Sequence, residues 1–434
     1  MNHELLRYKA YGGILMKILV VGGGGREHAI IWKLAQNPTI KKIYCAPGNG
    51  GIADLAECVP INAMDIEGIV NFSKEKQLDL VVVSPDDPLA AGMVDALQKA
   101  GIRAFGPVAD AAVIESSKAF SKELMKKYGI PSAEYEIFVD CDKALEYLKN
   151  SKYPIVIKAD GLALGKGVII AADYKQASEA VLSMMKDKVF GKAGEKIVIE
   201  EYLEGPEVSI LTFTDGKTIV PMVSSQDHKR ALDNDMGPNT GGMGTFSPSR
   251  IYTPEIADYC MKNIFKPTIE AMNKENRTFK GVLYFGLMLT KNGPKVLEYN
   301  ARFGDPETQV VLPKLKTDLL DIFNAVIDEK LEDINIEWND SAVVCVIAAS
   351  GGYPGKYTTG YEITGLDKLQ NKDDIFVFHA GTKKENGKVV TSGGRVLGVT
   401  AMAENIDNAR MKAYSAIKEI SFKDMHYRTD IGIK

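Results

Sequence analysis

The sequence predicts an α/β fold that opens with a parallel sheet. From Met16 onward, short apolar strands alternate with helices, which is the pattern of βαβ units. The first strands also run into glycine or proline turns, and in an open α/β sheet the turns at the carboxyl ends of the strands are where ligands bind. From about residue 342, strands and turns lead to a helix over 403–419, which predicts a small C-terminal α/β domain.

The elements follow in order. The first strand and its glycine turn occupy 17–25, and a helix over 26–38 ends at Asn37-Pro38. Further strands with their turns occupy 42–51, 78–92 and 102–107. The helix over 117–131 is capped at Ser116 or Ser117 and ends at Gly129 and Pro131. The later segments are strands at 154–160, 168–172, 196–205, 207–223, 281–290 and 297–307, with a helix around 254–273.

Composition narrows the class of protein. The chain has 434 residues, 45% of them hydrophobic and 25% charged, with a net charge of −4, so we expect neither general nucleic-acid binding nor membrane association. The five cysteines are scattered, which favours a reducing compartment over a disulfide framework or a zinc site. We expect a cytoplasmic protein. Residues 1–15 are expected to be an extension, or to lie upstream of a natural start at Met16.

The segment 297–307, LEYNARFGDPE, carries the strongest chemical signal. Read as a strand, it places Glu298, Asn300 and Arg302 on one face and apolar residues on the other. A carboxylate and an amide oxygen suit Mg²⁺, which takes few protein ligands and completes its shell with phosphate and water. The guanidinium suits an anion that arrives with the metal. The alternative is that these polar residues have no ligand, because the ends of strands often carry polar side chains that only face solvent.

The glycine turn at 22–25 predicts an anion site, because backbone N–H groups and a helix N-terminus meet there. The dinucleotide fingerprint needs a third glycine where this chain has Glu27, and the second strand ends without an acidic residue for the ribose. A sugar phosphate is therefore the better expectation, with 47–51 as a neighbouring wall. The alternative is that these glycines only form tight turns.

Three further segments point to a nucleotide and its substrates. The loop between Lys158 and Gly167 carries Lys166 but lacks Walker spacing, so we interpret it as a flap over phosphates. The alternative is an exposed hairpin with a solvated lysine. The acidic strand at 196–207 suits the edge of a nucleotide base, although such strand ends are usually solvated. The long loop 225–248 reads as a substrate loop. His228 in this loop is a candidate general base, with a charged positioning role as the stronger expectation.

Taken together, these segments resemble the ATP-grasp carboxylate–amine ligases, and within them the phosphoribosylamine–glycine ligase family. The resemblance runs from Met16 to the C-terminus and rests on GGREHA, APGN, SKAF, IVIKADGLALGKGV, IVIEEYLEG, SQDHKR, GPNTGGMG, RFGDPETQ, GGYPG, FHAGT and GGRVL. It implies an N-terminal domain over 16–118, an ATP-grasp domain over 119–341 whose two α+β subdomains clamp ATP (flap at about 138–208), and a C-terminal domain over 342–434.

The resemblance also implies an activity. ATP would phosphorylate the carboxylate of glycine, and 5-phosphoribosylamine would attack the glycyl phosphate to give glycinamide ribonucleotide, ADP and phosphate. The implied cofactor is Mg²⁺ or Mn²⁺, the partners are small molecules, and the assembly is a monomer or a weak dimer.

Site residues carry over by motif. The metal would be held by Glu298 and Asn300. ATP would be bound by Lys118, Lys158, Lys166, Glu200, Glu201, Tyr202, Leu203, Glu207 and Leu287. The substrates would be bound by Gly24, Gly25, Arg26, Glu27, Asn49, Asp86, Asp227, Lys229, Asn239, Thr240, Met243 and Arg302. The catalytic set would be Lys166, Arg302, Asp227 and Lys229.

One departure and two alternatives remain. Where the family usually reads Gly-Pro-Glu, this chain has Ser84-Pro85-Asp86, and the shorter acid is expected to loosen a contact with ribose hydroxyls. Within the fold, the alternative is ligation of another carboxylate to another amine, or carboxylation of a purine intermediate. Outside it, the alternative is a dinucleotide-binding dehydrogenase module, against which the missing third glycine counts.

Overall fold

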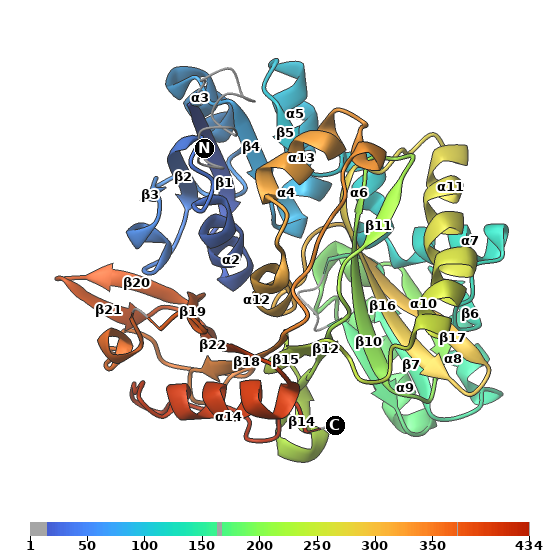
Figure 1. The fold of residues 1–434 in the computed structure, drawn as a ribbon. Helices are drawn as coiled ribbons and strands as arrows, with labels where there is room; N and C mark the ends of the chain where they lie inside the picture. Colours follow the sequence, from blue (N-terminus) through green and yellow to red (C-terminus); the bar gives the residue numbers. More distant parts are fainter. Residues whose placement is uncertain (1–14, 163–166, 371, 434) are drawn as a thin grey trace.

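The computed structural model describes residues 15–162, 167–370 and 372–433. Its N-terminal domain is the predicted open parallel sheet, with strand order β3-β2-β1-β4-β5 (Figure 1). The strands are β1 (Met16–Gly22), β2 (Ile40–Pro47), β3 (Glu57–Cys58), β4 (Leu80–Val83) and β5 (Ala104–Phe105). The helices are α2 (Gly25–Leu34), α3 (Ile66–Lys76), α4 (Asp86–Ala90), α5 (Met93–Lys99) and α6 (Ala109–Ser116). The sheet order reverses at β1, so the glycine turn after β1 lies at the topological switch point.

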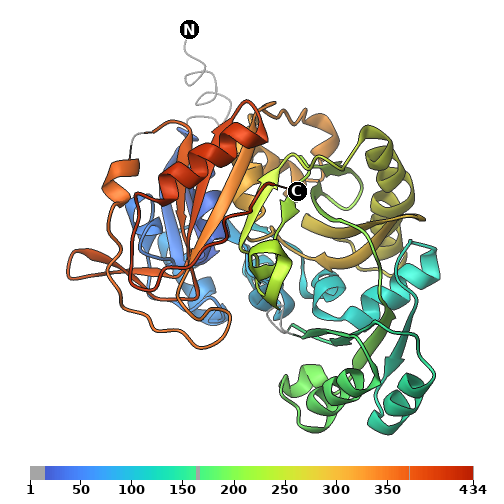
Figure 2. The same cartoon turned by 90° about the horizontal axis from the view of Figure 1, so that it is seen from below.

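The central part of the chain forms two antiparallel sheets. It begins with α7 (Lys118–Tyr128), where Ser117 Oγ accepts from Phe120 N and Gly129 takes the left-handed conformation, confirming the predicted caps. The first sheet has the order β6-β9-β7-β8, and together with helices α8 (Cys141–Lys149) and α9 (Tyr174–Val181) it projects from the molecule (Figure 2). Its strands are β6 (Tyr135–Phe138), β7 (Ile155–Ala159), β8 (Val168–Ala171) and β9 (Ile197–Glu201).

The second central sheet has the order β11-β10-β16-β17 and adjoins helices α10 (Pro254–Cys260) and α11 (Lys266–Lys274). Its strands are β10 (Glu207–Thr214), β11 (Ile219–Pro221), β16 (Gly281–Thr290) and β17 (Gly293–Asn300). The helix predicted around 254–273 is interrupted by a π-helical turn over Met261–Phe265. Pro267 explains the interruption, because it has no N–H to continue the α-helical ladder.

The C-terminal domain is built on a sheet of order β12-β15-β18-β22-β19, beside which α14 (Ile406–Ile417) lies (Figure 1). The strands are β12 (Gln226–Asp227), β15 (Gly244–Ser247), β18 (Ala342–Ala349), β19 (Ile375–His379) and β22 (Arg395–Ala403). Two of these strands come from the predicted substrate loop, which is thereby fixed to the C-terminal sheet. A hairpin of β20 (Thr382–Glu385) and β21 (Lys388–Thr391) reaches back to the N-terminal domain, where Gly50 N donates to Thr382 O at 3.1 Å.

The strand predicted over 297–307 is shorter than expected, since β17 ends at Asn300. The alternation of faces holds, with Tyr299, Ala301 and Phe303 at most 3% exposed. The ladder stops because Ala301 N donates to the Glu115 carboxylate at 2.7 Å instead of to a neighbouring strand. Among the described residues, none of the helices has the length and apolar character needed to cross a bilayer.

Candidate active site

Two carboxylates and a lysine meet over the sheet that carries β10 and β17. Lys229 Nζ lies 3.0 Å from Glu207 Oε2 and 3.4 Å from Glu298 Oε1. The Lys229 ammonium holds the pKa of Glu298 at about 2, although burial opposes this. In return, the two acids raise the pKa of Lys229 above its ordinary value against the lowering effect of burial. Glu298 and Lys229 are therefore both charged at neutral pH.

The oxygen donors here fit a hard divalent cation. Glu298 is ionised, and Asn300 follows two residues later on the same face of β17. When Mg²⁺ is bound together with a nucleotide, one carboxylate and one amide oxygen are a suitable set of protein ligands. Lys229 places a positive charge beside Glu298 in this structure, and a bound cation would do the same.

Two of the predicted phosphate-binding lysines lie close to this acid pair. Lys118 Nζ donates to Gly161 O at 2.8 Å, and Lys158 Nζ donates to Leu297 O at 3.1 Å, immediately before Glu298. Burial lowers the pKa of Lys118, which Glu298 partly offsets. Lys166 lies outside the described residues, so its predicted position over the phosphates stays a prediction.

The strand predicted to line a nucleotide base contains a buried ion-pair network. The Glu200 carboxylate forms ion pairs with Lys122 and Lys158, each with an N–O distance of 3.0 Å, and its side chain is 3% exposed. Burial lowers the pKa of Lys122 to about 8 despite Glu200. The Glu200 carboxylate therefore lies between two ammonium groups, and the Glu200 backbone is part of the ladder between β6 and β7.

The neighbouring predicted ATP residues differ in accessibility. Glu201 pairs with Lys295 at 2.8 Å. Tyr202 is 39% exposed, whereas Leu203 and Leu287 are buried. Tyr202 thus presents its side chain to solvent at the junction between the two central sheets, and Leu287 lies beneath the surface.

Arg302 stands between two acids just beyond β17. Its Nη2 lies 2.9 Å from Glu115 Oε1 and 3.8 Å from Asp86 Oδ2. Burial raises the pKa of Glu115 to about 7 against the opposing effect of Arg302. The buried Arg302 Nε donates to no atom within the described part of the chain, which leaves a cationic donor available to an anion.

The glycine turn is closed by the residue that breaks the dinucleotide fingerprint. Glu27 Oε2 accepts from Gly24 N at 2.6 Å, and Oε1 accepts from Arg26 Nε and Ser84 Oγ at 2.7 Å each. Ser84, the first residue of the Ser84-Pro85-Asp86 segment, thus anchors Glu27. Arg26 N donates to Asp305 Oδ2 at 3.2 Å. Two N–H groups at the start of α2 are therefore already satisfied by carboxylates, and Gly25 stands between them.

Asn49 joins the first and last domains. Its amide nitrogen donates to Gly23 O at 2.9 Å and His379 O at 2.7 Å, and its oxygen accepts from Gly51 N and Ile52 N at 3.0 and 2.9 Å. These four bonds use the whole hydrogen-bonding capacity of an asparagine side chain. Asn49 therefore holds the wall of the site with its side chain.

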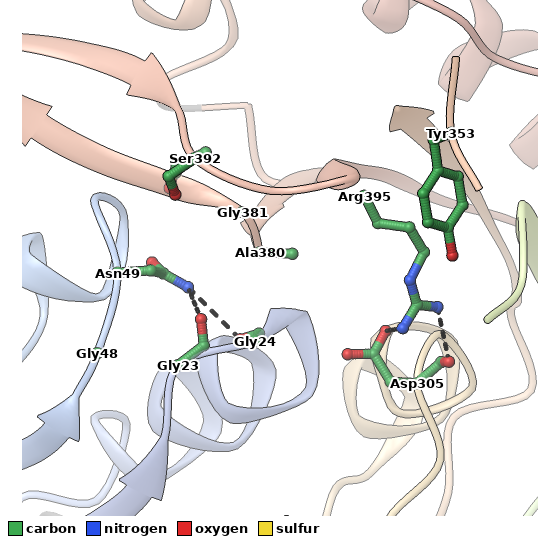
Figure 3. A pocket seen from close by; sticks show the side chains of 11 residues that line it. Gly23, Gly24, Gly48, Asn49, Asp305, Tyr353, Ala380, Gly381, Ser392 and Arg395 are labelled. Atoms are coloured by element: carbon green, nitrogen blue, oxygen red, sulfur yellow. Dashed lines mark hydrogen bonds and ion pairs between the residues drawn. The ribbon is translucent and has the colours of Figure 1, made fainter. Parts of the chain in front are cut away.

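A cavity of about 350 Å³ lies between these two domains (Figure 3). Arg395 enters it from β22, with Nη1 donating to Gly241 O at 2.6 Å and Asp305 O at 2.8 Å, and Nη2 3.4 Å from Asp305 Oδ1. The lining residues are Gly23, Gly24, Gly48, Asn49, Asp305, Tyr353, Ala380, Gly381, Thr382, Ser392 and Arg395. Of these, Gly24 and Asn49 were predicted as site residues.

Sequence reasoning missed the C-terminal half of this cavity. Tyr353, Thr382 and Arg395 belong to the segments GGYPG, FHAGT and GGRVL, which we used only as signs of the family. A lone arginine after a glycine pair was the available signal. Arg395 contacts Gly241 and Asp305, which lie far away in the sequence, so spacing alone could not assign Arg395 to this cavity.

The substrate loop brings Asp227 next to Lys229 and Arg395. Burial and the nearby Glu307 raise the pKa of Asp227 above its ordinary value. Its buried Oδ1 accepts no hydrogen bond from the described residues, while Gly242, at φ +111°, leaves room for that oxygen where a Cβ would lie 2.7 Å away. Asp227 thus keeps an acceptor for a group that the protein does not supply.

Other loop residues mainly shape the backbone. Thr240 Oγ1 donates to Lys229 O at 2.8 Å, and Asn239 pairs with Arg230 in the small hairpin of β13 (Arg230–Leu232) and β14 (Met236–Asn239). The Met243 side chain is fully buried. Burial lowers the pKa of His228 to about 4, so it is neutral at pH 7 and lacks the charge that a cationic positioning role needs.

Comparison with known proteins gives one consistent answer. The N, ATP-grasp (A) and C domains of phosphoribosylglycinamide synthetase match residues 16–115, 116–308 and 343–434. A phosphoribosylamine–glycine ligase of Clostridium acetobutylicum is 51% identical over 96% of this chain and 99% of its own length. One of Caldanaerobacter subterraneus is 50% identical with the same coverage.

Solved structures agree with this result. The crystal structure of phosphoribosylamine–glycine ligase from Thermotoga maritima superposes with a TM-score of 0.81 at 32% identity, covering 95% of this chain and 99% of the other. A biotin carboxylase from Campylobacter jejuni shares the fold, with a TM-score of 0.73 at 14% identity over 96% and 94% of the two chains. All three domains and the full-length relatives thus place the chain in the phosphoribosylglycinamide synthetase family of ATP-grasp enzymes.

Proposed function

We propose that this chain ligates glycine to 5-phosphoribosylamine at the expense of ATP, giving glycinamide ribonucleotide, ADP and phosphate in purine biosynthesis. Membership of the family supports this reaction. The observation that carries it is a convergence: the glycine turn after β1, Asp305 beyond β17 and Arg395 of β22 meet around one cavity. Elsewhere in the same chain, Glu298 lies with Lys229 in a charge cluster suited to a nucleotide and its metal.

The chemistry requires positioning rather than a covalent intermediate on the protein. A carboxylate oxygen of glycine attacks the γ-phosphorus of ATP, and ADP leaves. The amine of 5-phosphoribosylamine then attacks the acyl carbon of glycyl phosphate, the C–O bond to phosphate breaks, and the nitrogen loses a proton. Holding three substrates in line and offsetting phosphate charge supplies most of the rate enhancement in such a reaction.

For ATP, we assign Lys118, Lys158 and Lys166 to the phosphates. The base would lie along residues 200–203 and the ribose near Glu207. Glu298 and Asn300 would hold Mg²⁺ or Mn²⁺, which when bound offsets phosphate charge at the γ-position.

For the other substrates, the atoms left without partners guide the assignment. The free Arg302 Nε suits the glycine carboxylate, and the free Asp227 Oδ1 suits an ammonium or amine hydrogen. The phosphate of phosphoribosylamine would enter the cavity, where Arg395 offers positive charge and Thr382 and Ser392 offer hydroxyls. The amine is unstable in water, so closure of the flap would also protect it.

The test is ADP release by the purified chain with Mg²⁺-ATP and glycine, with and without freshly generated phosphoribosylamine. We expect release only with both co-substrates, and one glycinamide ribonucleotide formed per ADP. Release that requires bicarbonate instead of glycine would overturn the proposal in favour of a carboxylase. No release despite ATP binding would redirect it to another acid–amine pair.

A further inference from the structure

One buried carboxylate contacts three consecutive residues where β17 ends. Glu115, in α6, accepts from Ala301 N at 2.7 Å through Oε2, and its Oε1 lies 2.9 Å from Arg302 Nη2. The Asn300 amide nitrogen lies 2.9 Å from the same Oε1 and 3.1 Å from Tyr299 O. A side chain from another domain thus fixes the backbone, an amide and a guanidinium at one point.

Hydrogen-bonding chemistry determines which way the Asn300 amide faces. Turned the other way, its oxygen would meet only acceptors and its nitrogen only donors, so the nitrogen belongs on the Glu115 side. The amide oxygen is then directed away from Glu115, toward donor groups. Because a cation is bound by the oxygen and repelled by the N–H₂ group, this orientation decides whether Asn300 is a metal ligand.

Burying the negative charge of Glu115 at this position destabilises the fold. Its side chain is 6% exposed, and it sits in the last turn of α6, where the helix dipole disfavours negative charge. The charge is compensated by Arg302, which Asp86 also faces at 3.8 Å. A neutral glutamine would fill the same space and still accept from Ala301 N. What a glutamine cannot do is accept from Asn300 and Arg302 as well.

We propose that Glu115 is a positioning residue for the metal site: by accepting from the Asn300 amide nitrogen it turns the amide oxygen toward the cation, and by pairing with Arg302 it fixes the anion-binding guanidinium beside it. The inference rests on the proposed function, because it takes Asn300 as a metal ligand. It adds Glu115, a residue of the N-terminal domain, to the metal site. The strand motif at 297–307 does not contain this residue.

The direct test is the affinity for Mn²⁺ in the presence of ADP, measured by electron paramagnetic resonance or by calorimetry. In E115Q, the introduced amide would accept from Ala301 N and present its N–H₂ to Asn300, so the Asn300 amide should rotate and point its nitrogen at the metal. We expect Mn²⁺ affinity to fall about tenfold or more, as for other groups that orient metal ligands. Unchanged affinity would overturn the proposal.

A double-mutant cycle separates this role from a merely structural one. N300D alone places two carboxylates in contact and should bind Mn²⁺ poorly. In E115Q/N300D, the introduced glutamine can donate to one oxygen of the introduced aspartate while the other faces the metal, so affinity should recover to within about threefold of wild type. A double variant no tighter than N300D would refute the mechanism, and this comparison decides the question even if E115Q alone does not fold.

The matched control is D215N. Asp215 is also buried and accepts from Thr218 N and Leu331 N at 2.7 and 3.0 Å, away from the site. We expect D215N to lower the melting temperature without changing Mn²⁺ affinity. Since the binding assay uses neither glycine nor phosphoribosylamine, a chain that bound Mn²⁺-ADP as described but made no glycinamide ribonucleotide would refute the proposed reaction and leave the role of Glu115 standing.

Discussion

Substitution of Glu298 should affect turnover much more than it affects the stability of the fold. Glu298→Gln keeps the shape of the side chain and its place on β17 but removes the charge. We expect turnover at limiting Mg²⁺ to collapse while the fold persists, because the proposed metal site needs the charge of Glu298 more than the native packing does.

The structure sets the size of the two effects. The Lys229–Glu298 pair is long, at 3.4 Å, and the Glu298 side chain is 37% exposed, while Lys229 keeps its shorter contact to Glu207. Solvent screening limits a pair of this kind to about 1 kcal/mol of stability. Loss of a charged metal ligand should instead lower kcat by roughly a hundredfold, about 2.7 kcal/mol, in the range found when one group that stabilises the transition state is removed.

The assay is ADP release as a function of Mg²⁺ concentration, together with urea unfolding. The matched control is D328N, which breaks the Arg103–Asp328 pair of 2.8 Å at a comparable exposure of 44%, outside the site. D328N should show a similar small stability change and normal Mg²⁺ dependence. Normal turnover of Glu298→Gln at limiting Mg²⁺ would remove this residue from the metal site, and a stability loss of several kcal/mol would make it structural.

Three further outcomes are expected. Arg395→Met should raise the KM for phosphoribosylamine about thirtyfold or more, as for a lost charged hydrogen bond, with Mn²⁺-ADP affinity unchanged; an unchanged KM would place the phosphate elsewhere. Lys166→Ala should lower kcat by roughly a hundredfold, and a change in glycine KM alone would contradict its place on the flap. Burial holds the pKa of His28 at about 3 and that of His379 at about 4, below the ordinary 6.5. The unfolded chain therefore binds more protons below about pH 6.5, so stability should fall on acidification by about 2 kcal/mol per histidine at about pH 5. Urea titrations of His28→Asn should show a shallower pH dependence than wild type, and equal slopes would show that this histidine is not the cause.

Local pattern was enough to predict the elements that position the site. Alternating strands and helices predicted the parallel sheet, Ser117 and Gly129 predicted the bounds of α7, and a two-residue period predicted which side chains of β17 face the core. Each of these features depends on neighbours within a few residues along the chain. That is why a single sequence suffices for them.

Features set by distant partners were not predictable in this way. The end of β17 depends on Glu115, which is 186 positions away from Ala301, and the cavity depends on Arg395 meeting Asp305. Asn49 lines the cavity, and its side-chain bonds include one to His379, 330 positions away, which its sequence neighbours do not reveal. Such contacts are set by the packing of the domains against one another. Neither the periodicity of the sequence nor the spacing of its motifs predicts that packing.

The glycine turn shows how this changes the chemical interpretation. A strand, a glycine turn and a helix predict phosphate on free N–H groups, but Glu27 and Asp305 already accept from Gly24 N and Arg26 N. Two carboxylates at the helix start would also repel a phosphate placed directly on it. The positive charge that lines the cavity belongs to Arg395, whose Nη2 lies 3.4 Å from Asp305 Oδ1 and so offsets one of these two carboxylates. Because that arginine belongs to β22, an anion in the cavity depends on the C-terminal domain as much as on the glycine turn, and separating the two should abolish its binding even if the parallel sheet stays folded.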